Sequence, residues 1–264
     1  MKPAYVAGLG FWAPGLDGPA ALVDGARPAE GSRARSDGAS EPLCDLLPPR
    51  LARRASLLTR MMLEVASQAG TQASLDLSQV PTVFATAHGE VATMYLLLEM
   101  LHEGEGDLSP TRFHNSVYNT ASGYFSIAAG NRAFTTTIAA GDQTVALALV
   151  EAFCLLGSGS ASVLVVFGDE PIPLPFLREP GAAPLASAIC LTTQRPPYDL
   201  GVLAMPRRAA VASLPPLPAA YHSNPSGPSL ALVRALAQGR RGALQLAAGP
   251  QGWLIDLLPS PENP

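Results

Sequence analysis

Charge is scarce in this 264-residue chain, and lysine is nearly absent. Only 14% of the residues are charged, the formal net charge is −4, and Lys2 is the single lysine. No run of basic residues is longer than the pairs at 53–54 and 240–241. A nucleic-acid groove or an anionic-membrane patch needs a basic face, so we expect neither partner. A lysine Schiff base and a P-loop lysine are excluded unless Lys2 itself serves.

Cysteine is also rare, and no apolar run reaches the roughly 18 residues that a membrane helix needs. Cys44, Cys154 and Cys190 lie far apart without a CxxC spacing, and the apolar runs around Cys154 and Cys190 predict that both are small buried hydrophobes. Glycine and proline interrupt the first 15 residues too early for the apolar core of a signal peptide. We therefore expect a cytoplasmic protein without a membrane span, a metal site or a cofactor.

Hydrophobic residues are abundant and make up 48% of the chain. The length allows one large α/β domain or two small ones with a substantial core. So little charge fits either a large apolar contact surface or a simple compact monomer. Composition alone leaves both possibilities open.

Apolar strands alternate with amphipathic helices, which predicts an α/β fold with a mostly parallel central sheet and helices on both faces. Beyond residue 195 prolines become frequent. We expect residues 1–195 to form the main domain and residues 196–264 a short C-terminal extension that completes or caps it. Strands are predicted over 4–13, 81–87, 133–140, 160–170, 186–193, 242–248 and 252–258, the last two as a hairpin. Helices are predicted over 51–70, 91–104, the latter part of 113–130, 145–156 and 229–239.

Several motifs, in their order along the chain, resemble the amino-terminal half of a β-ketoacyl synthase, a condensing enzyme with the thiolase fold. The stretch AYVAGLGFWAPG is similar to the opening strand of that family, V-x-G-x-G-x-x-x-P-x-G. The segment that begins FHNSVYNTASGYFS is similar to F-x-x-N-x-x-A-G-x-x-S, and LVVFGDEPIP is similar to the strand that closes on Gly-Gly-x-Glu. The resemblance covers about residues 4–195 and implies a thiolase-like fold with a truncated C-terminal half.

The corner that carries the nucleophile in this family lacks one in this chain. The family reads roughly T-A-C-S-S-S there, and Ala139, Ala140 and Gly141 occupy the Thr-Ala-Cys positions. A shift by one residue gives Ala140 or Asp142, still without a thiol. Decarboxylative condensation needs a thiolate to carry the acyl group. The resemblance therefore implies a vestigial corner at Ala140, Gly141, Asp142 and Gln143 and no independent catalysis.

Other parts of the family's catalytic apparatus are also missing. Two histidines and a lysine come from the C-terminal half of a condensing enzyme, whereas residues 196–264 contain only His222 and no lysine. The remaining histidines are predicted to be satisfied or solvent-facing; they are His88, His102 and His114. Asp142 suits the first turn of the following helix as a cap or dipole partner, worth about 1 kcal/mol. Gln143 is interpreted as a polar pocket or interface group.

Condensing enzymes of this family pair through the strand and helix around the corner. A member that keeps this surface without catalysis resembles a chain-length factor, which implies a heterodimer with an active β-ketoacyl synthase and an acyl carrier protein as a further partner. The implied pathways are aryl polyene, polyketide or fatty-acid-like biosynthesis. Candidate residues for the acyl tunnel or dimer interface, each of which ordinary core packing also explains, are Phe113, His114, Asn115, Val117, Tyr118, Tyr124, Phe134, Thr136 and Ile138.

Two other functions remain open from the residues. One is an acyl-transferring or hydrolytic enzyme with a non-cysteine nucleophile, for which Ser116 with His114 or Asp142 is the candidate set. The other is a structural homodimer that binds an acyl carrier protein without altering its cargo.

Overall fold

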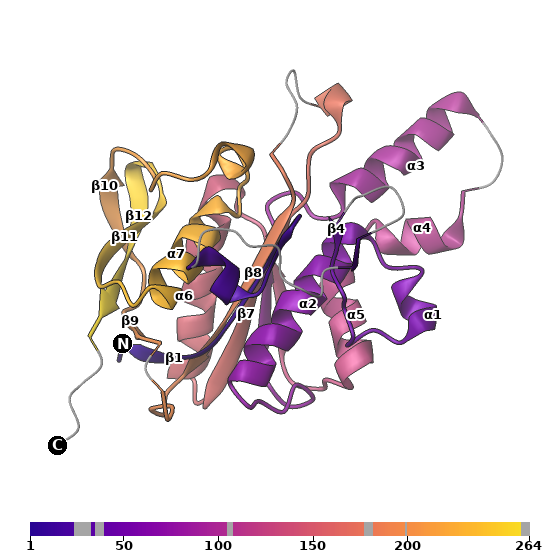
Figure 1. Cartoon of the computed structure of the whole chain (residues 1–264). Coiled ribbons are helices and arrows are strands. Elements are labelled where there is room, and N and C mark those ends of the chain that lie inside the picture. Colours follow the sequence, from indigo (N-terminus) through magenta and orange to yellow (C-terminus); the bar gives the residue numbers. More distant parts are fainter. Residues whose placement is uncertain (24–32, 35–39, 105–107, 177–181, 199, 260–264) are drawn as a thin grey trace.

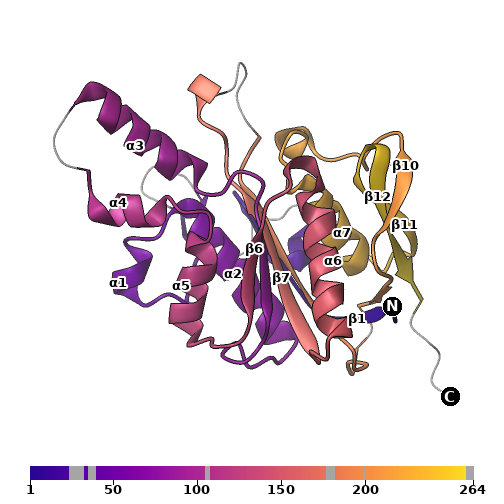
Figure 2. The ribbon, with the colours of Figure 1, turned by 180° about the vertical axis from the view of Figure 1, so that it is seen from behind.

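Three layers make up the molecule in the computed structural model, which describes residues 1–23, 33–34, 40–104, 108–176, 182–198 and 200–259. A twisted sheet lies in the middle (Figure 1). One face is covered by α2 (Leu57–Gln72) and α5 (Thr120–Ala129), and the other by α6 (Thr144–Gly157) and α7 (Gly227–Ala237) (Figure 2). The predicted α/β class with helices on both faces is confirmed.

The described strands of the central sheet run in the order β10-β12-β9-β1-β8-β7-β5-β6, with β11 beside β12 and β2 beside β1. They are β1 (Ala4–Ala13), β2 (Leu16–Asp17), β5 (Thr82–Ala85), β6 (Thr135–Ile138), β7 (Ser162–Asp169), β8 (Leu185–Thr192), β9 (Val202–Leu203), β10 (Arg207–Val211), β11 (Gly242–Ala247) and β12 (Gly249–Leu258). A separate pair is formed by β3 (Arg33–Ala34) and β4 (Ser40–Glu41). The order leaves β6 at one end of the sheet.

The sheet is mixed, so the prediction of a mostly parallel sheet is wrong. Only β5 pairs in parallel, with β6 and with β7, whereas β8 is antiparallel to both β7 and β1. Parallel neighbours need a crossover connection, usually a helix. The described residues between β7 and β8 contain only the short 3-10 helix η3 (Leu174–Phe176), and the chain returns antiparallel. The alternation of strands and helices therefore predicted the pairing direction correctly only for β5, β6 and β7.

The helix predicted from residue 51 begins six residues later. Ser56 is its N-cap and accepts a hydrogen bond from the Thr59 amide at 3.0 Å, while residues 49–52 form the separate α1 (Pro49–Ala52). A serine that caps at this point defines the start of α2. The short 3-10 helix η1 (Pro19–Leu22) precedes this region, and residues 24–32 and 35–39 lie outside the described part of the chain.

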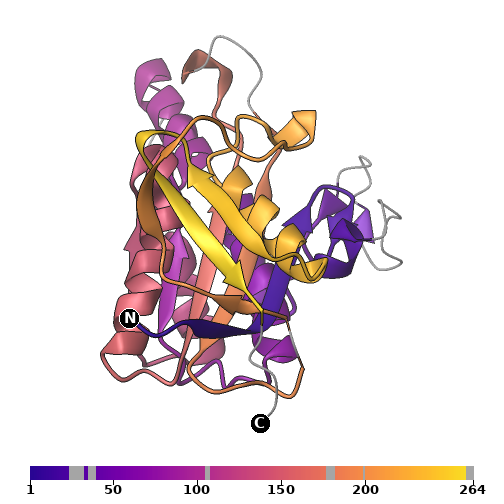
Figure 3. The same ribbon diagram turned by 90° about the vertical axis from the view of Figure 1, so that its left-hand side faces the viewer.

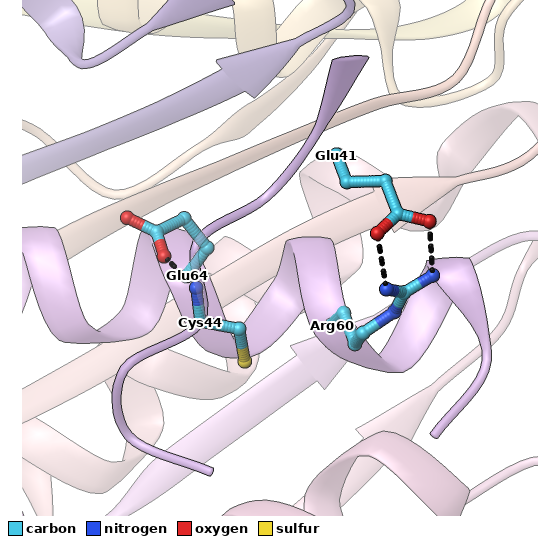
Figure 4. Close-up of polar contacts among 4 residues, drawn as sticks. All are labelled: Glu41, Cys44, Arg60 and Glu64. Carbon is cyan, nitrogen blue, oxygen red and sulfur yellow. Dashed lines mark hydrogen bonds and ion pairs between the residues drawn. The ribbon is translucent and has the colours of Figure 1, made fainter. Parts of the chain in front are cut away.

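The segment before α1 is fastened to α2 by two polar contacts (Figure 4). The Cys44 amide donates to Glu64 Oε2 at 2.6 Å. Arg60 donates to both carboxylate oxygens of Glu41, at 3.0 and 3.2 Å. Burial raises the pKa of Glu64 above its ordinary value, opposed by its hydrogen bonds from Gln68 and Cys44. These contacts hold the loop over the buried side of α2.

At the other end of the sheet, the C-terminal residues join the same sheet rather than forming a layer of their own. The predicted hairpin is confirmed as the antiparallel pair β11–β12, and the helix predicted over 229–239 is α7. The short strands β9 and β10 were not predicted, because prolines surround them. Figure 3 shows β10, β11 and β12 as the orange and yellow strands nearest the viewer. The boundary at residue 195 stays a prediction.

The strand β1 packs against α2 at unusually short range, which glycine makes possible. A Cβ on Gly8 would lie 2.1 Å from the Ala69 carbonyl oxygen, and one on Gly10 would lie 2.1 Å from the Val65 carbonyl oxygen. Both of these obstacles are backbone atoms of a helix, which cannot move aside as a flexible side chain can. The two glycines set the distance between this face of the sheet and α2.

We predict that Gly10→Ala destabilises the chain by about 1–3 kcal/mol, because the added methyl group overpacks the contact with α2. Gly123→Ala in α5 is the matched control: no atom lies within 4 Å of its added Cβ, and alanine in a helix favours folding by about 0.5–1 kcal/mol over glycine. Urea unfolding followed by circular dichroism measures both. Equal midpoints for Gly10→Ala and the wild type would contradict the packing argument.

Candidate functional site

The corner between β6 and α6 is built by the backbone and one threonine. Residues 141–143 form the 3-10 helix η2 (Gly141–Gln143), after which α6 begins at Thr144. Thr144 Oγ1 accepts from the Ala140 amide at 2.9 Å and donates to the Gly141 carbonyl at 2.7 Å. Asp142 is exposed and makes no capping hydrogen bond at this helix start, so of its two predicted roles the cap is wrong, whereas the role as a dipole partner stays a prediction. The Thr144 hydroxyl therefore stabilises the turn through hydrogen bonds to the backbone of Ala140 and Gly141.

Gly141, at the predicted nucleophile position, has the left-handed backbone conformation with φ 53°. Glycine adopts this conformation without the steric cost that a Cβ brings. The position is exposed, and an added Cβ would meet no atom within 4 Å. Position 141 has space for a side chain, but glycine supplies no atom that could carry an acyl group.

Gln143 is held by the C-terminal part of the chain. Its Oε1 accepts from the Trp253 indole Nε1 at 3.0 Å, and the Arg208 guanidinium lies 4.2 Å from the centroid of the Trp253 ring. Trp253 belongs to β12 and is buried. The amide of Gln143 therefore ties the corner to the end of the sheet, 110 residues further along the chain. No local sequence signal predicts that contact.

The three cysteines do not replace the missing thiol. Burial raises the pKa of the Cys44 and Cys190 thiols to about 12, which keeps them protonated and unreactive. Cys154 on α6 is exposed, so the prediction that it is buried is wrong, while that for Cys190 is confirmed. α6 turns Cys154 away from the sheet although its sequence neighbours are apolar. Each of the three lies outside the corner.

A buried carboxylate lies at the carboxyl end of β7, next to the loop that follows β5. Asp169 Oδ1 accepts from Thr86 Oγ1 at 2.9 Å and from the amides of Ala87 and His88 at 2.8 and 3.2 Å. Its Oδ2 accepts from Ser226 Oγ at 2.6 Å. Burial raises the pKa of Asp169, and these hydrogen bonds oppose the rise. The carboxylate fixes the loop after β5 against the start of α7.

Two more carboxyl groups meet at the start of α3 (Val91–Glu103). Glu90 Oε1 accepts from Ser56 Oγ at 2.7 Å and Thr59 Oγ1 at 2.9 Å, and Glu170 Oε1 accepts from the Ala92 amide at 3.1 Å. Burial first, and the neighbouring Glu90 second, raise the pKa of Glu170 to about 8. Burial also raises the pKa of Glu90. Sequence reasoning missed this pair, because its members are far apart in the chain.

The predicted tunnel or interface residues fall into three sets: exposed, partly buried and buried. Phe113 and His114 on α4 (Pro110–Asn115) are exposed. Thr136 and Ile138 are partly buried. Asn115 and Tyr124 are buried, and the Tyr124 hydroxyl donates a hydrogen bond to Asn115 Oδ1 at 3.1 Å. The remaining members, all exposed, are Val117, Tyr118 and Phe134. The exposed set lies on α4, on the loop after it and beside β6, and Asn115 with Tyr124 belongs to the packed interior.

The edge strand β6 has one side of its backbone turned away from β5. Phe134 O accepts from the Thr82 amide and Ile138 O from the Thr86 amide. In a strand the peptide groups of successive residues alternate in direction, so Thr135 and Thr137 direct theirs to the open edge. A strand from another chain can pair there.

The histidines follow the prediction, since all four are exposed in the structure. Among the described residues, no group of three or more His, Cys, Asp or Glu side chains could hold a metal ion. In the part of the chain that the structure describes, none of the helices is long and apolar enough to cross a membrane.

Residues 27–254 match the family model of the β-ketoacyl synthase N-terminal domain. No curated protein matches the sequence. The chain is similar in structure to a chain of the ketosynthase ApeO in complex with its chain length factor ApeC from Xenorhabdus doucetiae, with a TM-score of 0.71 and 22% identity over 97% of this chain and 100% of that chain.

Two further solved structures give similar matches. One is AntDE:AntF, a type II PKS acyl-carrier protein in complex with its ketosynthase bound to the hexaketide, with a TM-score of 0.74, 14% identity and coverage of 97% and 98% of the two chains. The other is the ishigamide ketosynthase/chain length factor, with a TM-score of 0.66, 16% identity and the same coverage. These matches establish the thiolase-like ketosynthase fold that the resemblance implied.

Asp169→Asn is predicted to destabilise the chain by about 2 kcal/mol or more, because an amide NH₂ then faces donors that need a buried acceptor. Asp142→Asn, in the exposed turn of the corner, is the control and should leave stability within about 0.5 kcal/mol. Thermal and urea unfolding at pH 7 measure the difference. Similar losses for both variants would show that the Asp169 hydrogen bonds contribute little.

Stability should fall as pH rises from about 4.5 to about 8, because Glu170 keeps its proton in the folded chain over this range and loses it on unfolding. The contribution of one such group is about 1.4 kcal/mol per pH unit and levels off above pH 8. The side chain of Glu170→Gln cannot ionise, so the slope of the free energy of unfolding against pH should lose the contribution of one proton. Urea unfolding between pH 5 and 9 tests this, and identical slopes for the two proteins would refute it.

Proposed function

This chain belongs to the family of β-ketoacyl synthase N-terminal domains, and we propose that it is a non-catalytic, chain-length-factor-like subunit. Its partner is an active β-ketoacyl synthase, with which it forms a heterodimer that extends chains held on an acyl carrier protein. The pathway is of the aryl polyene, polyketide or fatty-acid-like class. The proposal makes pairing the task of a subunit whose own corner performs no chemistry.

One observation supports the proposal most: β6, the turn at residues 141–143 and α6 follow one another as the resemblance to a condensing-enzyme corner predicts, and the residue that the resemblance assigns to the thiol position is Gly141. Gly141 is exposed with φ 53°, and both buried cysteines have raised pKa values. Thioester formation on this chain through the family's mechanism therefore lacks its nucleophile. The chain keeps the strand, turn and helix of this corner without a cysteine in it.

The surface around β6 supports pairing with another chain. Four large apolar side chains on this part of the molecule are markedly exposed: Phe134 next to β6 at 53%, Ile127 on α5, which contacts β6, at 68%, Phe113 on α4 at 63%, and Val117 on the loop after α4 at 46%. Monomeric proteins rarely leave such a group of side chains in water, and aromatic anchors dominate the energetics of interfaces. The open backbone of Thr135 and Thr137 lies beside them and can extend the sheet into the partner.

Chain length also supports the proposal. The matches to the complexes of ApeO with ApeC and of the ishigamide ketosynthase/chain length factor cover 97% of this chain and 98–100% of the matched chains. The matched chains are therefore about as long as this one, so a ketosynthase-like chain of this size occurs within such complexes.

The alternative of a serine-dependent acyl transferase or hydrolase finds less support. Ser116 Oγ donates to the Phe113 carbonyl at 2.8 Å at the end of α4. Among the described hydrogen bonds, none joins Ser116 to His114 or Asp142. A serine nucleophile needs a base within hydrogen-bonding reach. The homodimeric carrier-binding protein is separated from the main proposal by the experiment below.

Phe134→Glu is predicted to weaken the complex with the synthase by about tenfold or more, because a charge replaces an apolar anchor at the pairing edge. Leu214→Glu is the matched control: it is also an exposed apolar residue, but it follows β10 at the opposite end of the sheet. The chain is coexpressed with an active β-ketoacyl synthase of the aryl polyene or polyketide class. Light scattering after gel filtration gives the stoichiometry, and titration calorimetry gives the affinity.

A 1:1 complex that only Phe134→Glu weakens is the expected result. A stable homodimer that does not bind the synthase would favour the carrier-binding alternative. An acyl or malonyl adduct on this chain alone, detected by intact mass, would favour the serine enzyme. Either outcome overturns the proposed function.

A further inference from the structure

The helices α3 and α4 form an arm that projects from the body of the molecule (Figure 1). Along α3 only Val91 and Leu97 are buried, although the helix is rich in leucine. Leu98 and Leu101 are 47% and 60% exposed. A helix with so few buried side chains gains little from packing. The arm therefore depends on what holds it at its base.

The base of α3 is held by hydrogen bonds to two glutamates. Glu90 is the N-cap residue of α3, and its carboxylate accepts from Ser56 and Thr59 at the start of α2 and from Thr93 at 3.1 Å. Glu170, at the end of β7, accepts from the Ala92 amide. The helix is thus joined to α2 through one carboxyl group and to the sheet through the other.

Four titratable groups surround this base. Glu90 and Asp169 both act electrostatically on Glu170 and raise its pKa. His88, from the loop after β5, lowers the pKa of Asp169, and Asp169 in turn helps to raise the pKa of Tyr118, whose hydroxyl donates to the Thr86 carbonyl. Glu90 and Asp169, the two titratable groups that act on Glu170, are both negative when ionised. Each of them therefore opposes ionisation of Glu170 at this buried position.

We propose that the arm is a proton-linked element: a proton held on Glu170 beside Glu90 seats the start of α3 on the sheet, and release of that proton to solvent loosens the arm. The coupling is local, because the carboxyl group that titrates also contacts the start of α3; the hydrogen bond from the Ala92 amide favours its ionised form, but burial and the neighbouring Glu90 outweigh that bond. In the ionised state, like charges on Glu90 and Glu170 oppose the seated arrangement, and swinging the helix away hydrates both.

A consequence for pairing rests on the proposed function. α4 packs against α3 and carries the exposed Phe113 of the pairing surface. Loosening of the arm displaces this side chain, so affinity for the synthase is expected to fall with the same pH profile. The seating of the arm itself is a property of the isolated chain and is tested without any partner.

The test is hydrogen–deuterium exchange of the isolated chain between pH 5.5 and 9, expressed as protection factors so that the intrinsic pH dependence cancels. For amides 92–98, protection should fall by up to about tenfold per pH unit and level off above about pH 8, as one linked proton requires. Amides of β7 serve as the internal reference. They should stay more protected than α3 at every pH, because the arm opens without global unfolding.

Three variants make the assignment specific. Glu170→Gln keeps an acceptor for the Ala92 amide but cannot ionise, and should make α3 protection independent of pH. Glu103→Gln removes a carboxylate from the exposed end of the same helix and should behave as the wild type. Glu90→Gln removes the like charge, so its profile should level off at a lower pH, and it replaces Glu170→Gln if that variant does not fold.

Constant α3 protection in the wild type, or an unchanged profile in Glu170→Gln, would overturn the proposal, as would exchange of α3 and β7 at one common rate. None of these results depends on the synthase. If α3 protection depends on pH as expected but no heterodimer forms with the synthase, only the proposed function is overturned. The proposal for the arm then remains supported.

Discussion

The buried carboxylate of Asp169 is the contact on which the carboxyl edge of the sheet depends. Its side chain binds the loop after β5 and Ser226, and its backbone carbonyl accepts from Asn224 Nδ2 at 3.2 Å. Three stretches that are more than fifty residues apart therefore meet at one group. A carboxyl group in the interior is tolerated only when its oxygens are hydrogen-bonded. The C-terminal residues supply part of that set, so they are integral to the edge that carries the corner.

Sequence patterns predicted most helices and strands because their signals are local. The periodicity of α2 and α6 and the apolar runs of β1, β7 and β8 each lie within one segment. Pairing direction was not predictable in the same way, since it depends on whether a connection crosses the sheet or returns beside its strand. β9 and β10 escaped prediction because a two-residue strand and a strand between prolines carry almost no periodic signal.

The candidate site divides in the same manner. The missing thiol at Gly141 could be predicted from a motif of adjacent residues, and the exposure of Phe113 and Phe134 agrees with a surface that pairs. By contrast, the Gln143–Trp253 contact and the Glu90–Glu170 pair join residues 110 and 80 positions apart, and no pattern within a segment encodes them. The fold brings such residues together only after the sheet order is set.

The two ends of the sheet differ in a way that bears on pairing. An edge strand exposes unpaired peptide groups, and proteins usually protect such edges with charged side chains. Among the described strands, β10 and β11 each pair only with β12 at one end of the sheet; β10 begins with the exposed Arg207 and Arg208, and Arg240 and Arg241 precede β11. β6, at the opposite end, reads TTTI and is flanked by alanines and Phe134, without any charge. The proposed function assigns this uncharged edge to a second chain, and it thereby links the absence of a thiol at Gly141 to the surface around β6.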